Sequence, residues 1–585
     1  MLSTAPVRQR AVDRANQWQA RLRDVSLPLI LASATLATAW LLPGHFLPWP
    51  SFQQEAVAAA AGLLFCWASL QWRSGMPLRW PVLCWVPALL ACTPWLQFAS
   101  GQVRFLDDAL LPSLYLVALA LSICVGATLG QSGLRGQLLE GFTAAAVTAG
   151  ILSVGIALWQ WLSLDPFSDW LGELPPGGRP YANLGQPNHL STLLVIALAG
   201  ILRWYETRRL GAFTGVLAAA WLGLGIALTQ SRTGWLCIAV LVAGCLLLRR
   251  RAALRTSPAA AVGLGLLFSL FVNLAASLQS LLLLGAAPAL RTEAGTRLEH
   301  WKVLGDAALH APWFGYGWNQ VSMAQYEFAP RHAAVGEYLL HSHNLVLDLA
   351  LYCGLPVALL VTLGLAAWGL RTLRTCRDGQ RWALLAVWLA LLTHAMLEYP
   401  LHYLYFLLPA GLLMGVLHVP AARGPWSQQS LPRVVLWAAP LALAVMLGLV
   451  TIEYMRIEES LRRLRFAVAR IGTTTTAGLT SPEVHLLPLW KRYHDATVTQ
   501  PRAGMSAQEM RLVADLAQRY SYVPSLQRYA VALGLNGQPE EARAVLGRIC
   551  KIYREPFLGG ARTAWEERRK KDVALAGIAF PDCQQ

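Results

Sequence analysis

Long apolar runs alternate with short polar segments along the first 454 residues of the chain. A helix needs roughly 20 apolar residues to cross the hydrocarbon core of a bilayer, and most of these runs approach that length. The pattern predicts an all-α polytopic membrane protein with about 12–13 transmembrane helices. The runs lie near residues 27–46, 55–71, 80–97, 109–129, 139–163, 189–204, 211–229, 234–248, 259–285, 344–370, 382–397, 402–418 and 434–453.

Composition supports this class of protein and excludes others. Hydrophobic residues make up 55% of the 585 residues and charged residues only 14%, a balance that would leave large apolar patches on a soluble globule. The net charge of +16 does not indicate a nucleic-acid partner, because Lys and Arg accumulate in the cytoplasmic loops of membrane proteins. No basic soluble region with interleaved aromatic residues is present either. We therefore expect a lipid bilayer, and no nucleic acid, among the partners.

The arginines mark alternate loops between the apolar runs. Because positive charge accumulates on the cytoplasmic side, we expect a multi-pass protein of the bacterial inner membrane whose active site faces the periplasm. With an odd number of spans, the tail from residue 455 onward also lies in the periplasm. The arginine-bearing side holds Arg8 to Arg23, Arg73, Arg79, Arg135, Arg203 to Arg209, Arg249 to Arg255, Arg371 to Arg381, Arg423 and Arg433. The expected outer loops are 47–54, 98–108, 164–188, 230–233, 286–343 and 398–401.

Two domains are expected. Residues 1–454 form a transmembrane catalytic domain that includes the outer loops 164–188 and 286–343, and residues 455–585 form a soluble helical domain in the periplasm. Loop 286–343 is rich in Trp, Tyr and Phe, which favours a packed cap over a solvated tether.

The C-terminal region carries a helical pattern of its own. The segment from Tyr520 to Arg548 predicts two amphipathic helices joined by a turn at 536–539, similar to one tetratricopeptide unit. A plain helical hairpin explains the pattern equally well. Cys550 and Cys583 could form a disulfide if this region is exported, and none of the ten cysteines stands in a metal-binding CxxC pair.

Polar clusters in the expected outer loops are the candidates for chemistry. The run 183–189 (NLGQPNH) brings Gln186, Asn188 and His189 to the mouth of a span, where amide groups can bind a sugar or a phosphate through neutral hydrogen bonds. An N-cap and turn is the structural alternative. The turn 229–234 (TQSRTG) holds Arg232 at the membrane surface on the side that positive charge avoids, which favours a functional cation. Contact of the side chain with lipid headgroups is the structural alternative.

Two further clusters lie in the loop 286–343. The segment 295–302 (GTRLEHWK) offers Arg297 and Lys302, which suit a diphosphate, although a solvated helix with ion pairs is equally compatible. The segment HSHN places His341 and His343 at the entry of an apolar run, as a metal site, a headgroup contact or a general base. A metal site is disfavoured, because two histidines supply at most two ligands and no carboxylate or cysteine accompanies them at a recognised spacing.

The last candidate is the outer turn 398–403 (EYPLHY), whose Tyr399 is either a functional polar group or part of an interfacial aromatic belt. The order of the NLGQPNH, TQSRTG, RLEHWK, HSHN and EYPLHY segments resembles the bacterial O-antigen ligase and protein O-oligosaccharyltransferase superfamily. Among its branches the pilin-glycosylating O-oligosaccharyltransferases are the most similar, over residues 150–415 and the tail.

This resemblance implies an enzyme that transfers a glycan en bloc from undecaprenyl diphosphate to Ser or Thr hydroxyls of an exported, pilin-like acceptor protein, without a metal or another cofactor. It further implies that His343 is the catalytic base, with His341 as a companion, and that Arg232 and Arg297 bind the diphosphate. Gln186 and Tyr399 match polar residues that the protein-directed members require.

Three other functions stay open at this point. An O-antigen ligase would use the same donor with a lipid A core sugar as the acceptor, and a Wzy-type polymerase would extend a polysaccharide. A transporter of the lipid carrier is disfavoured, because such a protein needs ionisable residues in the middle of its spans, whereas the ionisable residues of this chain lie in its loops.

Overall fold

A computed structural model describes residues 26–71, 79–164, 170–175, 177–281, 297–418, 429–430, 433–471 and 479–583. Apart from a pairing of β1 (Arg79–Trp80) with β2 (Gln429–Ser430), all the regular elements that it describes are helices. The all-α class is therefore confirmed. The predicted basic segment Arg8 to Arg23, Arg73, Arg423 and the first part of the predicted loop 286–343 lie outside these ranges.

The apolar runs form helices close to their predicted bounds. Six helical segments of the described ranges are long and apolar enough to cross a membrane, namely 82–99, 106–129, 135–161, 258–275, 355–374 and 437–468. The chain is thus a multi-pass membrane protein, and the full number of spans stays a prediction. The helices at the predicted runs include α2 (Leu27–Leu41), α3 (Phe52–Gln71), α6 (Leu106–Leu129), α7 (Arg135–Trp161), α8 (Pro187–Glu206), α9 (Ala212–Leu228), α10 (Arg232–Leu248), α11 (Pro258–Leu281), α16 (Gly379–Ala395) and α17 (Leu404–Leu417).

Three of the predicted runs differ from the structure in their course. The run 344–370 is two helices, α14 (Leu345–Cys353) and α15 (Leu355–Arg374). Gly354 between them has φ +85°, and any Cβ at this position would collide with the backbone of Trp313. The run 80–97 is divided into η1 (Val82–Cys84), α4 (Trp85–Leu90) and α5 (Thr93–Ala99). The run 434–453 continues well past its predicted end as α18 (Arg433–Val468), so no break occurs at residue 454.

Arginine-bearing segments gather at one end of the helical bundle. Arg203 pairs with Glu140 at 2.6 Å, Arg255 donates its backbone N–H to Glu206, and Arg381 donates to the carbonyl of Leu417 at 2.7 Å. These contacts join the ends of α7, α8, α16 and α17 with the segment between α10 and α11. This arrangement agrees with the sorting of loops that the arginine pattern predicts.

The polar motifs meet at the opposite end. Residues 297–343, here called the cap, form α12 (Arg297–His310), α13 (Val321–Phe328) and η2 (Ala329–Arg331). Val303, Leu304 and Phe328 of the cap pack into one apolar cluster with α14, so the cap has a core as predicted. The cap and the turn 398–403, which contains η3 (Pro400–His402), lie above the ends of α8 and α10.

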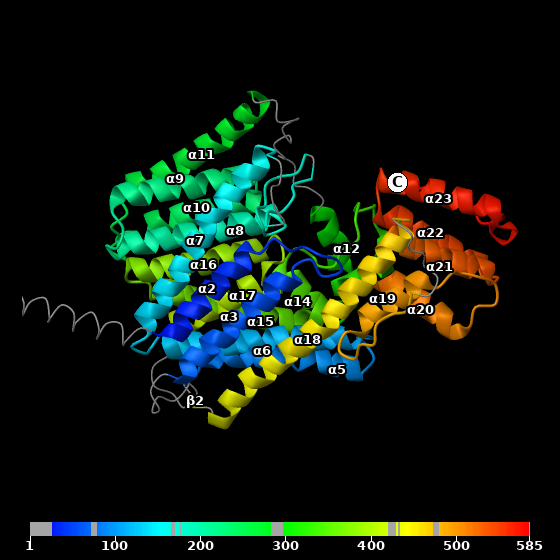
Figure 1. The fold of residues 1–585 in the computed structure, drawn as a ribbon, viewed down its shortest axis with the longest axis horizontal. Helices are drawn as coiled ribbons and strands as arrows, with labels where there is room; N and C mark the ends of the chain where they lie inside the picture. The colour runs from blue at the N-terminus through cyan, green and yellow to red at the C-terminus, as the bar shows by residue number, and fades with distance from the viewer. Residues whose placement is uncertain are drawn as a thin grey trace, which may run out of the picture.

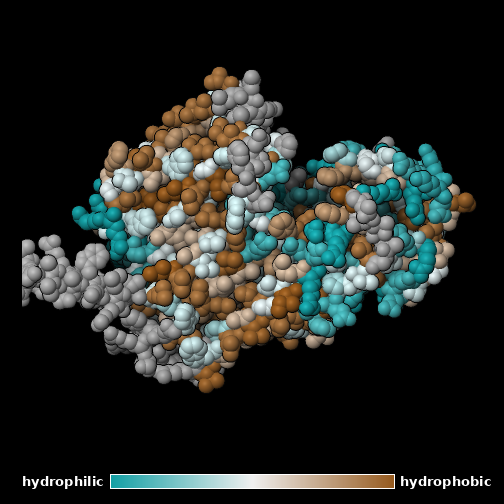
Figure 2. All heavy atoms as spheres, in the orientation of Figure 1, coloured by the Kyte–Doolittle hydropathy of each residue, from teal (hydrophilic) through white to brown (hydrophobic). Residues whose placement is uncertain are grey.

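Residues 479–583, here called the tail domain, consist of five α-helices and the short η4 (Val573–Leu575). They form a polar unit at the cap end of the apolar bundle (Figures 1 and 2). The predicted hairpin is present as α21 and α22, and α20 and α23 pack beside it. Cys550 and Cys583 form the predicted disulfide. The α-helices are α19 (Pro488–Val498), α20 (Ala507–Arg519), α21 (Val523–Leu535), α22 (Pro539–Ile552) and α23 (Phe557–Lys571).

A buried ion pair fixes the tail domain to the bundle. Arg519 of α20 donates two hydrogen bonds, of 3.0 and 2.9 Å, to the carboxylate of Asp108 at the start of α6, and both side chains are at most 7% exposed. Ser322 of the cap donates to the carbonyl of Arg519, and Gln320 donates to Asp108. Tail domain, cap and bundle are therefore joined at one point, which puts the tail domain on the same side as the cap.

We predict that Asp108→Ala releases the tail domain, because Arg519 is then left buried without its carboxylate. Loss of one partner of a buried pair costs about 3–5 kcal/mol. The control is Arg104→Ala, which breaks an exposed pair with Asp515 between the same parts of the chain and should cost about 1 kcal/mol or less. Thermal unfolding and limited proteolysis of the full chain in detergent measure the two effects. Equal stability of the two variants would contradict the prediction.

Candidate active site

The carboxylate of Glu398 is the centre of the polar cluster at the cap end. Its Oε2 accepts a hydrogen bond from Nδ1 of His343 at 2.6 Å, and its Oε1 accepts from Nδ2 of Asn188 at 3.0 Å and from Arg297. The side chain is only 6% exposed, whereas His343 and Arg297 are each 21% exposed. One buried acid therefore holds three polar groups, two of which can also reach a bound molecule.

His343 sits in a strained stretch of backbone. Its φ is +60°, in the left-handed region that few residues other than glycine adopt. Ser342 on one side donates its N–H to Asp348, and Asn344 on the other caps α14 and donates Nδ2 to the carbonyl of Met396. Such strain persists only when surrounding contacts enforce it, and it is typical of functional sites. The sequence HSHN thus folds so that the imidazole points at Glu398.

The hydrogen bond to Glu398 decides which nitrogen of His343 is available. Glu398 is ionised: burial raises its pKa, but the hydrogen bond with His343 and the positive charge of Arg297 outweigh burial and lower the pKa to about 2. A carboxylate can only accept, so Nδ1 of His343 carries the proton. In the neutral ring Nε2 is then the acceptor, which is the state that a general base requires.

Asn188 connects Glu398 to the turn that carries Arg232. Its Oδ1 accepts a hydrogen bond from Oγ of Ser231 at 2.7 Å, and Ser231 is the N-cap of α10, of which Arg232 is the first residue. Arg232 is half-buried at this position. One buried hydrogen bond therefore joins the segment 183–189 to the turn 229–234, although Asn188 and Ser231 lie more than 40 residues apart in the chain.

A second cluster lies behind His343. The ring centroid of His341 lies 4.0 Å from that of His402 and 4.5 Å from that of Tyr399, and burial together with His402 and His343 lowers the pKa of His341 well below its usual value. Asp348 joins them, and the ligand atoms of His341, Asp348 and His402 all lie within 4.8 Å of one another. These three residues could hold a metal ion, so the sequence argument that no carboxylate accompanies the histidines does not hold in the fold.

The other predicted site residues occupy different positions. The ring of Tyr399 lies 5.0 Å from that of His343. Gln186 is the half-buried N-cap of α8, two residues before Asn188. His189 is buried deeper in the bundle, where its Nδ1 is 3.0 Å from the hydroxyl of Tyr405, and Lys302 is exposed on α12. The structure thus brings Asn188, Arg297, His343 and Tyr399 together but places His189 and Lys302 away from Glu398.

Three segments of the chain match known family models. Residues 217–362 match a model described as O-antigen ligase, residues 180–202 one described as protein glycosylation ligase, and residues 382–564 one described as virulence factor membrane-bound polymerase, C-terminal. Each residue bound to Glu398, and Glu398 itself, falls in one of these segments.

Two proteins of Acinetobacter baylyi are similar to the chain, one over most of its length and the other over about half. A general O-oligosaccharyltransferase is 29% identical over 555 residues, which are 91% of this chain and 93% of that protein. A ComP-specific O-oligosaccharyltransferase is 28% identical over 326 residues, 55% of this chain and 58% of that protein. Together with the motifs in the predicted order, these matches confirm the resemblance to the bacterial O-antigen ligase and protein O-oligosaccharyltransferase superfamily, and the chain is a glycosyltransferase.

Proposed function

We propose that this glycosyltransferase moves a glycan en bloc from undecaprenyl diphosphate to Ser or Thr hydroxyls of exported proteins such as pilin. The observation that carries the proposal is the His343–Glu398–Arg297 cluster, which combines a base and a cation at one accessible point. The name of the relative similar over 91% of the chain supports a protein acceptor. An O-antigen ligase or a Wzy-type polymerase remains the alternative, because two of the matched models carry those names.

The reaction is a direct displacement at the anomeric carbon. Nε2 of His343 takes the proton of the acceptor hydroxyl, and the hydroxyl oxygen forms a bond to the anomeric carbon. The bond between this carbon and the diphosphate oxygen breaks, the diphosphate leaves with the electron pair, and the configuration inverts. Glu398 stabilises the imidazolium that forms, as a carboxylate does for a catalytic histidine in serine hydrolases. Base assistance of this kind contributes about 10²- to 10⁴-fold.

Arginine side chains stabilise the leaving diphosphate. Arg297 uses one nitrogen for Glu398, and a guanidinium has five N–H groups, so others are available for phosphate oxygens. Arg232 lies beside Ser231, which Asn188 joins to the same carboxylate. Two arginines can balance the developing negative charge, so the mechanism needs no metal.

A periplasmic position of the site accounts for two further observations. The arginine-bearing segments lie at the opposite end of the bundle from the cap, in agreement with the positive-inside rule. The tail domain, which docks on the cap, contains the disulfide Cys550–Cys583, and such bonds persist in oxidising compartments. The inner membrane of a bacterium, with the cap in the periplasm, satisfies both.

The test is transfer to purified acceptors with purified enzyme and an undecaprenyl-diphosphate-linked glycan, in the presence of a metal chelator. We expect a mass increase of the pilin by one whole glycan, and a rate that is at least about 100-fold lower for His343→Ala. His310→Ala, which removes an exposed histidine of the cap, should keep the wild-type rate. Transfer to lipid A core instead of pilin would show a ligase, and growth of the glycan itself would show a polymerase. Unchanged pilin glycosylation by the His343→Ala variant would falsify the role of the base.

We predict that Glu398→Gln lowers kcat by about 10²-fold or more while the protein stays folded, since an amide keeps the size of the side chain but not the charge that stabilises imidazolium. Steady-state transfer assays measure kcat, and thermal unfolding in detergent shows that the variant is folded. A wild-type kcat in a folded Glu398→Gln variant would contradict the role of this carboxylate.

We predict that Arg297→Lys and Arg232→Lys each lower kcat/KM by about 10- to 100-fold, because lysine keeps the charge but cannot bind two phosphate oxygens through a planar fork. Arg331→Lys is the matched control, since Arg331 is an exposed arginine of the cap away from Glu398. Steady-state transfer at varied donor concentration provides the values. Full activity of both lysine variants would count against binding of the diphosphate by these arginines.

A further inference from the structure

A large apolar pocket lies in the bundle between α2, α3, α6, α17 and α18. It contains about 1070 Å³ of empty space, counting its open side, and almost all its lining side chains are apolar. On α3 the lining includes Ala56, Ala58, Ala59 and Gly62, whose small side chains leave the space that larger residues would fill. The pocket is separate from the polar cluster, and the proposed displacement does not use it.

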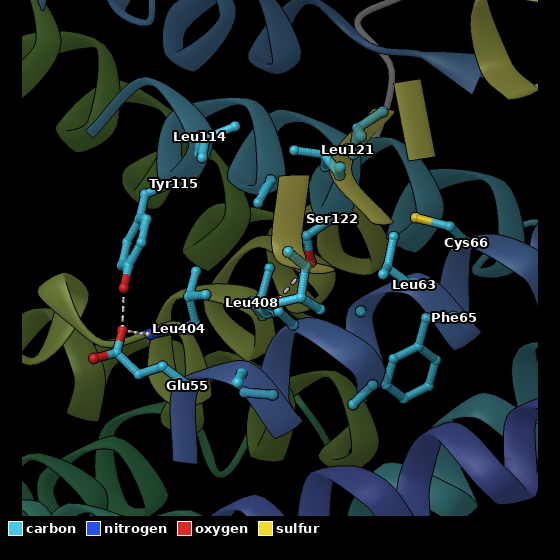
Figure 3. A pocket seen from close by; sticks show the side chains of 18 of the residues that line it. Glu55, Leu63, Phe65, Cys66, Leu114, Tyr115, Leu121, Ser122, Leu404 and Leu408 are labelled. Carbon is cyan, nitrogen blue, oxygen red and sulfur yellow. Dashed lines mark hydrogen bonds between the residues drawn. The ribbon is translucent and has the colours of Figure 1, made fainter. Parts of the chain in front are cut away.

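The pocket is long in the direction of the helices. Its lining extends from Glu55 to Cys66 on α3 and from Leu111 to Val125 on α6, which at a rise of 1.5 Å per residue corresponds to about 16 Å and about 21 Å. Figure 3 shows Glu55 and Tyr115 at one end and Phe65 and Cys66 at the other. The space is therefore a mainly apolar slot along the bundle axis, with the carboxyl group of Glu55 at one end. The hydroxyl of Ser122, which also lines the slot, donates to the carbonyl of Leu408.

The polar end of the slot lies at the same end of the bundle as Glu398. Glu55 accepts hydrogen bonds from Tyr115 of α6, from Ser51 and Trp49, and from the backbone N–H of Leu404 (Figure 3). Both of its carboxyl oxygens therefore have hydrogen-bond partners within the protein. Leu404 lines the slot and directly follows the turn 398–403. Within that turn the rings of Tyr403 and Tyr399 stack at 6.0 Å, and Tyr399 lies beside His343. A short series of contacts thus leads from the slot to the proposed base.

We propose that this slot holds the polyprenyl chain of the lipid diphosphate donor while the diphosphate lies at Arg297. The inference rests on the proposed function and adds the site of the apolar part of the donor. A linear hydrocarbon chain fits a slot of about 16–21 Å that is mainly apolar along its length. The slot extends to Leu404, directly after the turn 398–403. Because bilayer lipid is itself apolar, the chain would be held by van der Waals packing against the lining rather than by the hydrophobic effect.

The charges favour this chain over that of a bilayer phospholipid. The lining residues include no Lys or Arg, and Glu55 is the one carboxyl group among them. A phospholipid with its acyl chain in the slot would place a phosphate near Glu55 without a cation from the lining. The diphosphate of the donor reaches Arg297, which lies beyond Tyr399 and His343 on the same side. The slot therefore suits a lipid whose head is bound elsewhere in the site.

The test uses the full-length His343→Ala protein in nanodiscs and a polyprenyl diphosphate that carries a diazirine in its chain. After illumination we expect cross-linked peptides from the parts of α3, α6, α17 and α18 that line the slot. Excess undecaprenyl diphosphate should remove the cross-links, and excess phosphatidylethanolamine should not. Cross-links elsewhere in the bundle, or equal competition by phosphatidylethanolamine, would overturn the proposal. Because the protein is inactive, this result does not depend on catalysis.

Variants that fill the slot give a second, independent measurement. Ala59→Phe and Ala118→Phe should reduce the cross-linking and raise KM for the undecaprenyl donor at least about tenfold, because the larger ring occupies the space of the chain. Ala60→Phe is the matched control, because Ala60 is next to Ala59 on α3 but does not line the slot. An equal effect of all three variants, or no effect of any, contradicts the proposal.

The two experiments separate failure of this inference from failure of the proposed function. Cross-linking in the slot without glycan transfer to any acceptor would leave the slot as a polyprenyl site and remove the transferase proposal. Glycan transfer to pilin with unchanged KM in Ala59→Phe and Ala118→Phe would keep the function and remove the slot.

Discussion

The buried carboxylate of Glu398 is the constraint that organises the functional end of this membrane protein. A charge that is 6% exposed is tolerated only when it is paired and hydrogen-bonded. Glu398 obtains its partners from α8, from the start of α12 and from the segment that leads into α14, which are Asn188, Arg297 and His343. Satisfying one acid therefore fixes the relative positions of the amide run, the cap and the candidate base. The same hydrogen bonds to Glu398 position the site residues and stabilise this end of the bundle.

The helices and their sorting could be predicted because both signals are local. Apolar length and the positions of arginines are visible in any short window of the sequence, and the structure has helices at the predicted runs. The exceptions depend on contacts that a window does not contain. Gly354 divides a single apolar run because the chain passes close to Trp313, and α18 extends to Val468 because Tyr454, Ile457 and Leu461 continue to find buried neighbours beyond the apolar run.

The site could be predicted residue by residue but not as an arrangement. The amide, guanidinium and imidazole groups each indicate a chemical role from their type alone, and Asn188, Arg297 and His343 do meet. The sequence does not indicate a functional role for Glu398 in the EYPLHY turn, because acidic residues are common in outer loops and its three partners are far away in the chain. Those partners lie 55, 101 and 210 residues away in the chain. The metal-binding geometry was hidden for the same reason, because His402, which completes it with His341 and Asp348, comes from the separate turn 398–403. His189 and Lys302 lie away from Glu398.

The long helix α18 connects the parts of the molecule that the two substrates would meet. Leu443 to Val450 form one wall of the apolar slot, and Leu461 and Leu464 pack with Val484 and Leu487 of the tail domain. The tail domain in turn holds Asp108 through Arg519 and contacts the cap. Because α18 is continuous from Arg433 to Val468, a displacement of the tail domain must also move that wall or bend the helix. The tail domain is therefore mechanically part of the site rather than an appendage to it, which explains why it is fixed by a buried ion pair and not by surface contacts alone.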